Sequence, residues 1–150
     1  MKIISYRLNN ATSYGVLVNN ELYSLPENQS GLPATMNAFL ALEESGMEMA
    51  RQTAQQIEEG TLAVTPVKNY EILAPLPHPT SCRDGYAFRQ HVEAARKNRG
   101  VEMIPEFDQY PIFYFTNHQA VEGPGPVYCM PDHFEQLDFE LEIAIVIGKK

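Results

Sequence analysis

The stretch LDFELEIAIVIGKK, residues 137–150, decides how this sequence is expected to fold. Acidic and apolar residues alternate in its first half, and a two-residue period is that of a β-strand with one polar and one apolar face. The run AIVIG, residues 144–148, has no polar face, which is typical of a strand buried in a sheet. The stretch therefore predicts a strand that begins near a sheet interior with carboxylates on one face.

Three carboxylates, those of Asp138, Glu140 and Glu142, share that face. Neighbouring Cα atoms in such a set lie roughly 6.7 Å apart, so the charges repel one another unless a positive group lies between them. A hard divalent cation with oxygen ligands is such a group. The alternative is a strand with a solvated acidic face. The apolar run that follows favours the cation, because burying unpaired carboxylates is costly.

A second group of candidates lies in RDGYAFRQH, residues 83–91, at the start of a predicted helix. Asp84 lies near the predicted helix start, where the helix dipole favours an acidic residue, so a helix N-cap is the simplest interpretation of it. His91 lies on the same helical stripe and is either a packed or solvated histidine or a general base, because histidine titrates near neutral pH. Tyr86 and Arg89 flank the stripe, and each is either an ordinary surface residue or a contact for an anionic substrate.

The chain begins with a predicted β-meander. The turn residues Asn19-Asn20 tolerate the positive φ angles of a hairpin, and they separate the last two of three β-prone runs. These runs lie at residues 1–8, 14–18 and 21–25.

A helical region follows the meander. Thr35 is the predicted N-cap of a helix that Gly46 interrupts, and a second helix is expected over about Glu48–Glu59. Gly60 is the expected stop of this second helix. Residues 61–73 are again β-like.

The composition changes near residue 70, where we place a domain boundary. Eight of the 11 prolines fall between positions 75 and 131, which indicates short elements joined by loops. Residues 1–70 are expected to form a small N-terminal domain. Residues 71–150 are expected to begin a larger unit, with a helix over about Asp84–Asn98 and a strand at residues 112–115.

Composition excludes several classes of function. The net charge of −8 repels phosphate backbones, so no nucleic-acid partner is expected. The chain has neither a run of 18 apolar residues nor the apolar core of a signal peptide, so no membrane partner is expected. Its two cysteines are far apart and form no CxxC motif, which favours a reducing, cytoplasmic setting.

With these motifs in this order, the chain resembles the fumarylacetoacetate hydrolase family. EILAPLPHP, residues 71–79, resembles the segment that leads into the family's catalytic domain, and RDGYAFRQH resembles the helix that holds an Asp and, seven residues later, a His. LDFELEIAIVIGK resembles the family's E-x-E strand, which ends in Ile-Gly-Lys. The resemblance implies an α+β fold: a small N-terminal α/β cap domain, then the first part of a mixed β-sandwich roll catalytic domain.

The resemblance also implies roles for individual residues. Asp84, Glu140 and Glu142 would bind a divalent cation, which is Mg²⁺ or Ca²⁺, or else Mn²⁺. His91 would be the base that activates water, and Tyr86 would lie near the substrate.

The implied substrates are small β-diketo or acylpyruvate-type 2-oxo acids, as in aromatic catabolism. The implied reaction is hydrolysis of a C–C bond, in which the cation polarises the carbonyl that water attacks. One alternative is decarboxylation, isomerisation or hydration of a 2-oxo acid on the same scaffold. The other is a non-catalytic fragment that folds through association.

The sequence departs from the family pattern in several places. Gly85 stands where a bulky aromatic residue is expected, and Ala94 stands where shorter members have a Glu. The family's further Asp ligand and its catalytic Lys lie downstream of the E-x-E strand, so we expect this chain to be the N-terminal part of a longer protein. Family members are commonly homodimers, and a homodimer is expected here.

Overall fold

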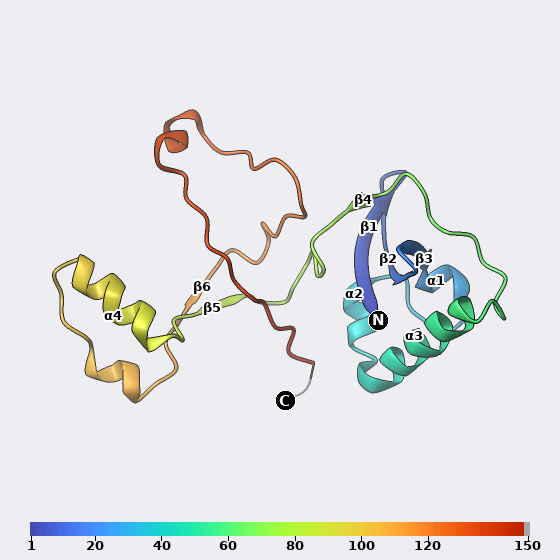
Figure 1. Ribbon diagram of the computed structural model, residues 1–150, viewed down its shortest axis with the longest axis horizontal. Helices are drawn as coiled ribbons and strands as arrows, with labels where there is room; N and C mark the ends of the chain where they lie inside the picture. Colours follow the sequence, from blue (N-terminus) through green and yellow to red (C-terminus); the bar gives the residue numbers. More distant parts are fainter. Residues whose placement is uncertain (149–150) are drawn as a thin grey trace. The chain divides into compact units, whose positions relative to one another are not determined.

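The computed structural model describes residues 1–148 of the chain (Figure 1). It combines helices with antiparallel sheets, which confirms the α+β class. The described residues form two compact units. The first unit holds Met1–Pro77 and the residues from Glu122 onward, and the second unit holds His78–Val121. The domain boundary expected near residue 70 stays a prediction.

The first unit is built on an antiparallel sheet of strand order β3-β2-β1-β4. Asn9-Asn10 and Asn19-Asn20 adopt φ angles between 50° and 65°, which suit the type I′ turns of tight hairpins. The second turn confirms the prediction, and the first turn closes the other hairpin of the predicted meander. The strands are β1 (Lys2–Leu8), β2 (Ala11–Val18), β3 (Glu21–Ser24) and β4 (Glu71–Ile72).

Of the β-like residues 61–73, only Glu71–Ile72 form a strand. Val67 makes a single antiparallel bridge to Leu22, and its N–H donates to the Leu22 carbonyl at 2.7 Å. Pro66 beside it has no N–H to donate, which limits longer pairing here.

Helices α1 (Leu25–Asn28), α2 (Met36–Leu40) and α3 (Glu43–Glu58) follow the first three strands. Thr35 is the N-cap of α2, as predicted, because its hydroxyl accepts a hydrogen bond from the Ala38 N–H at 3.3 Å. Among residues 1–148, no helix is both long and apolar enough to cross a bilayer.

The predicted helix break at Gly46 is wrong, and so is the predicted start of the second helix at Glu48. Helix α3 runs through Gly46 and ends just before Gly60, the expected stop, whose φ is +68°. A Cβ at position 46 would lie 2.9 Å from the Leu42 Cβ and 3.1 Å from the Phe39 carbonyl oxygen. Close packing against α2, rather than helix termination, explains this glycine.

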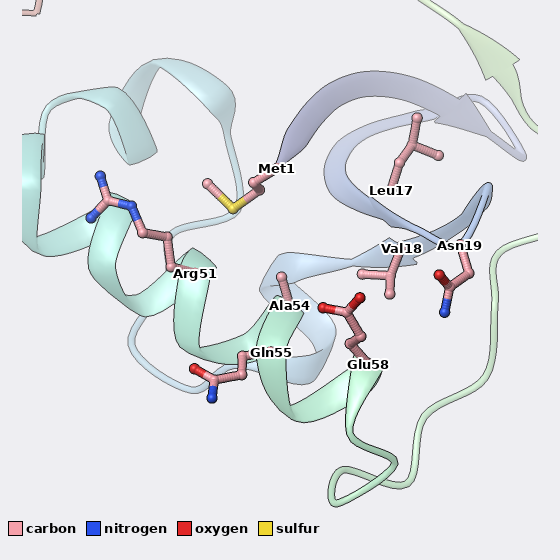
Figure 2. A pocket seen from close by; sticks show the side chains of 8 residues that line it. All are labelled: Met1, Leu17, Val18, Asn19, Arg51, Ala54, Gln55 and Glu58. Carbon is pink, nitrogen blue, oxygen red and sulfur yellow. The ribbon is translucent and has the colours of Figure 1, made fainter.

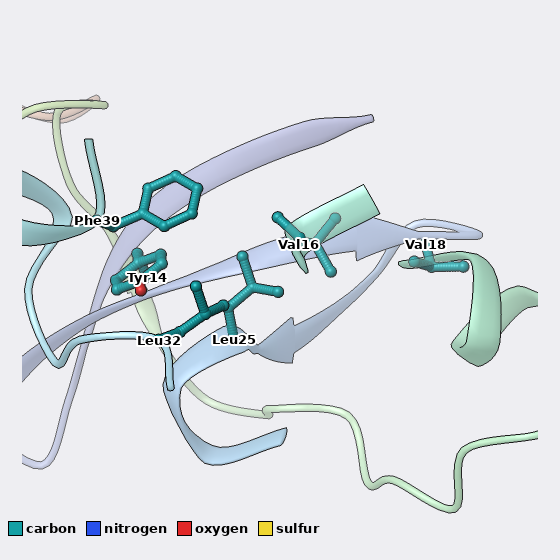
Figure 3. Packing of buried hydrophobic residues seen from close by; sticks show 7 residues of the cluster. Tyr14, Val16, Val18, Leu25, Leu32 and Phe39 are labelled. Carbon is teal, nitrogen blue, oxygen red and sulfur yellow. The ribbon is translucent and has the colours of Figure 1, made fainter. Parts of the chain in front are cut away.

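The core of the first unit lies between β2 and the helices (Figure 3). Alternate residues of a strand share a face, and one face of β2 is buried against the helical side chains. The Tyr14 hydroxyl in this core donates to the Pro33 carbonyl at 2.8 Å. Burial raises the pKa of Tyr14 to about 12. The buried cluster consists of Tyr14, Val16, Val18, Leu25, Leu32, Phe39 and Ala50.

The second unit contains β5 (Arg83–Gly85), α4 (Arg89–Asn98), the 3₁₀ turn η1 (Pro105–Asp108) and β6 (Phe113–Phe115). Strand β6 and the end of α4 at Asn98 confirm the predictions. The predicted helix start at Asp84 is wrong, because Asp84 pairs with Tyr114 in the antiparallel ribbon of β5 and β6. Gly85 disfavours a helix, and Phe88 at the N-cap is extended.

The end of the described chain differs most from the prediction. After the 3₁₀ turn η2 (Pro131–Gln136), residues 137–148 form no strand, and Ile145 and Ile147 are 79% and 80% exposed. The predicted buried strand is therefore wrong for these residues, and its positions 149–150 lie outside the described residues. A strand needs neighbours for its backbone N–H and C=O groups, and within residues 1–148 no segment pairs with this one.

Candidate functional site

The second unit brings together two of the predicted site residues, Tyr86 and His91. Their ring centroids are 6.3 Å apart with an interplanar angle of 84°, so the rings meet edge to face. The Tyr86 hydroxyl accepts a hydrogen bond from Nη2 of Arg99 at 3.2 Å, and the Tyr86 N–H donates to the Ile112 carbonyl at 3.1 Å. His91 is exposed in the first turn of α4. The His91 imidazole thus lies beside the ring of a tyrosine whose hydroxyl is anchored by Arg99.

Asp84 lies half-buried in β5, directly opposite Tyr114 of β6. Paired residues of an antiparallel ribbon share a face, so Asp84 and Tyr114 lie on one side. Arg83 lies on the other side, where its guanidinium carbon is 5.3 Å from the Phe113 ring centroid and 4.9 Å from that of Phe115. These cation–π contacts stabilise the ribbon that carries Asp84.

Arg89, predicted to contact an anionic substrate, is engaged by acidic side chains of the second unit. Its Nε donates to Glu93 at 2.8 Å, and its Nη1 pairs with Asp108 of η1. Hydrogen bonding to Asp108 and then to Glu93 raises the pKa of Arg89. Substrate binding by Arg89 stays a prediction, and any anion would compete with both carboxylates.

Glu140 and Glu142 lie in the segment that follows η2, and both are exposed. Asp138 beside them accepts a hydrogen bond from the N–H of Phe139 at 2.8 Å. The three-carboxylate cation site of Asp84, Glu140 and Glu142 draws on residues from both units and stays a prediction.

The first unit has a hollow of about 310 Å³ between the chain start, the end of β2 and α3 (Figure 2). Arg51 is a cationic residue of its wall, but its guanidinium pairs with Glu44 at 2.8 Å and with Glu48 at 3.1 Å. Because these carboxylates already offset that charge, the hollow carries no assigned role. It is lined by Met1, Leu17, Val18, Asn19, Arg51, Ala54, Gln55 and Glu58.

Three neighbours of the candidate residues were not expected from the sequence. Arg99 and Phe107 contact Tyr86, and Tyr114 lies opposite Asp84. The IFYF strand was a signal for Tyr114, but its partner depends on the strand register, which the sequence leaves open. Phe107 lies in the short 3₁₀ turn η1, and no periodic sequence pattern indicated it.

Comparison with known proteins finds matches in the part of the chain that holds the candidate residues. Residues 80–150 match the family model described as fumarylacetoacetate (FAA) hydrolase C-terminal. The chain is 24% identical over 153 residues to the fumarylacetoacetate hydrolase domain-containing protein 2 homolog of Dictyostelium discoideum, covering 100% of this chain and 47% of that protein.

Relatives named as oxaloacetate tautomerases also match. The human mitochondrial oxaloacetate tautomerase FAHD2A is 30% identical over 121 residues, and the Xenopus laevis mitochondrial oxaloacetate tautomerase is 27% identical over 121 residues. Each match covers 79% of this chain and 34% of the relative. The chain thus spans about half the length of its curated relatives, or less. Residues 80–150, which carry both motifs of the candidate site, are thus similar to the C-terminal domain of the fumarylacetoacetate hydrolase family.

Proposed function

We propose that this chain contributes to a divalent-metal-dependent enzyme that moves a proton on a 2-oxo acid, as in keto–enol tautomerisation. The observation that carries the proposal is the pairing of His91 with the Tyr86 ring, in a chain whose relatives are named oxaloacetate tautomerases. Isomerisation was one of the alternatives expected for this scaffold. The relatives' names favour it over the C–C hydrolysis that was expected first.

The chain's own residues can perform both proton steps of a tautomerisation. In the keto-to-enol direction one proton leaves the carbon beside the carbonyl, and another is delivered to the carbonyl oxygen. His91 would take the first proton, since histidine binds and releases protons near neutral pH and this ring is exposed. Tyr86 would donate the second, because its oxygen accepts from Arg99 and a phenol that accepts a hydrogen bond still has its O–H to donate.

Asp84, Glu140 and Glu142 are the proposed cation ligands. Carboxylate oxygens are the donors that Mg²⁺, Ca²⁺ and Mn²⁺ prefer. Within residues 1–148, no lysine or arginine pairs with these three carboxylates, so their charge is available for a cation. A bound divalent cation would supply a Lewis acid that polarises the substrate carbonyl.

Hydrolysis of a C–C bond in a β-diketo or acylpyruvate-type acid is the second candidate. The hydrolase description of the matching family model supports it. His91 would then take a proton from the water that adds to the carbonyl. The C–C bond breaks, and the leaving carbon gains a proton.

A non-catalytic fragment that folds through association is the third candidate. The exposed apolar side chains of residues 139–147 support it, because association would cover them.

The wider setting also belongs to the proposal. We propose the mixed β-sandwich roll for the catalytic domain, a homodimer, and a small-molecule substrate without nucleic-acid or membrane partners. A cytoplasmic location stays part of the proposal, whereas relatives such as human FAHD2A are named mitochondrial.

The cation site is tested by calorimetric titration of the 150-residue chain with Mg²⁺ and Mn²⁺. We expect saturable one-site binding that Glu140→Ala and Glu142→Ala each weaken. Glu135→Ala, a change at another exposed glutamate of the same region, is the control and should leave the affinity unchanged. Unchanged affinity in both test variants would rule out the assigned ligands.

The reaction is tested by adding oxaloacetate and an acylpyruvate separately, with cation present. Faster decay of the enol absorbance of oxaloacetate, without cleavage products, supports tautomerisation. Cleavage of the acylpyruvate supports hydrolysis instead. If neither reaction occurs and the melting temperature is unchanged at saturating cation, the non-catalytic fragment is favoured, because a bound cation stabilises the folded state by mass action.

A further inference from the structure

We propose that Phe107 is a positioning residue for His91 and that it acts through the ring of Tyr86. The inference rests on the proposed function, because it takes His91 as the proton-transfer group. All of the residues that carry it belong to the second unit.

The Tyr86 ring makes two perpendicular aromatic contacts. Its centroid is 6.3 Å from that of His91, with an interplanar angle of 84°, and 6.5 Å from that of Phe107, with an angle of 82°. Edge-to-face pairs at this separation are attractive and depend on ring orientation. The hydroxyl of Tyr86 is held by Arg99, and its backbone N–H by Ile112. Phe107 is therefore the contact that sets the rotation of a ring whose two ends are already anchored.

Phe107 is in turn held in place by Arg89. The guanidinium carbon of Arg89 lies 5.7 Å from the Phe107 ring centroid, and the same guanidinium pairs with Asp108, the next residue of η1. Its Nε pairs with Glu93 one turn along α4, so Arg89 ties η1 to the helix that carries His91. In Figure 1 these are the short orange turn and the yellow helix α4. These contacts give Arg89 a structural role within the second unit.

Loss of the Phe107 ring would release Tyr86 without removing any proton-transfer group. The distance between the Tyr86 hydroxyl and the His91 imidazole would then vary. Small errors in the placement of reacting groups reduce turnover more than they reduce substrate binding. In the active enzyme, Phe107→Leu should therefore lower kcat at least tenfold and leave KM within about twofold.

The direct test is an NMR measurement on the 150-residue chain, because the Hε1 signal of His91 reports the aromatic ring beside it. His91→Gln assigns this signal among the chain's 4 histidines. We expect Phe107→Leu and Tyr86→Leu to move the His91 signal, and Phe107→Tyr to restore it. The double variant Tyr86→Leu/Phe107→Leu should match Tyr86→Leu alone, because Phe107 acts through Tyr86.

Tyr110→Ala, at an exposed aromatic residue just after η1, is the matched control and should leave the His91 signal in place. Circular dichroism shows whether each variant is folded, and Phe107→Tyr remains informative if Phe107→Leu unfolds. A His91 signal that Phe107→Leu leaves unchanged overturns the proposal, and so do additive shifts in the double variant. The proposed function is tested separately, because unchanged turnover in His91→Gln would overturn it. That outcome would leave the NMR test of Phe107 unaffected.

Discussion

Replacement of Tyr14 by Phe should remove the contribution of one phenol ionisation to the loss of stability of the first unit at strongly alkaline pH. The Tyr14 side chain is fully buried, and its hydroxyl donates to the Pro33 carbonyl at 2.8 Å. Burial raises the pKa of Tyr14 from 10.0 to about 12, because the phenolate would lie in an apolar core. Folding therefore favours the protonated form.

The sign and size of the effect follow from this shift. A pKa that is raised in the folded state adds stability below the unfolded value, and this stability is lost as the pH rises from about 10 to about 12. Two pKa units at about 1.4 kcal/mol each amount to about 3 kcal/mol. Near pH 8, Tyr14→Phe should be less stable than the parent chain by about 1 kcal/mol, because the Pro33 carbonyl loses its donor. The curves of unfolding free energy against pH for the parent chain and for Tyr14→Phe should cross at about pH 11.

Urea unfolding followed by circular dichroism at a series of alkaline pH values measures this crossing. The difference between the two chains is the informative quantity, because ionisation of other groups affects both alike. Tyr128→Phe is the control, since Tyr128 is 89% exposed and its variant should run parallel to the parent. A constant difference between Tyr14→Phe and the parent across the whole range would refute the reasoning.

Three further changes test other parts of the structure. Gly15→Ala should destabilise the sheet by about 1–3 kcal/mol in urea unfolding. The reason is that its Cβ would meet the Tyr23 carbonyl oxygen and lie 2.9 Å from Leu22 Cδ1. An unchanged unfolding midpoint would contradict this packing. Ser24→Ala should raise stability by about 1 kcal/mol, because the buried Ser24 Oγ has no hydrogen-bond partner among residues 1–148, and a lower midpoint would show a hidden partner. His91→Ala should abolish turnover and leave cation affinity unchanged in calorimetry, whereas loss of cation binding would contradict the proposal that His91 is a base.

Local signals in the sequence predicted local structure correctly. Thr35 has a hydroxyl that can accept from an N–H three residues ahead, and it caps α2. Asn19-Asn20 tolerates positive φ, and it forms the hairpin turn. The α+β class was implied by the family resemblance, and the local signals, each of which depends on a few neighbouring residues, agree with it.

Features that depend on distant residues were predicted poorly. The residues around Asp84 are typical of a helix start. Asp84 nevertheless lies in a strand, because it pairs with a strand near residue 114. The same dependence holds for residues 137–148, whose apolar pattern describes a buried strand only where neighbouring strands exist. Of the site residues, Tyr86 and His91 meet as neighbours along the chain. Phe107 enters only through the three-dimensional position of η1.

The two Asn-Asn turns have a consequence for the order in which the first unit folds. They join β1, β2 and β3 through contacts between near neighbours, so the entropy of loop closure for this meander is small. Strand β4 reaches β1 only after a long loop closes, as the Ser5–Pro75 hydrogen bond across 70 residues illustrates. Because contacts between near neighbours form faster, the meander should appear early in refolding and β4 should dock late. Amide protons of β1 that face β2 should then be protected from exchange before those that face β4.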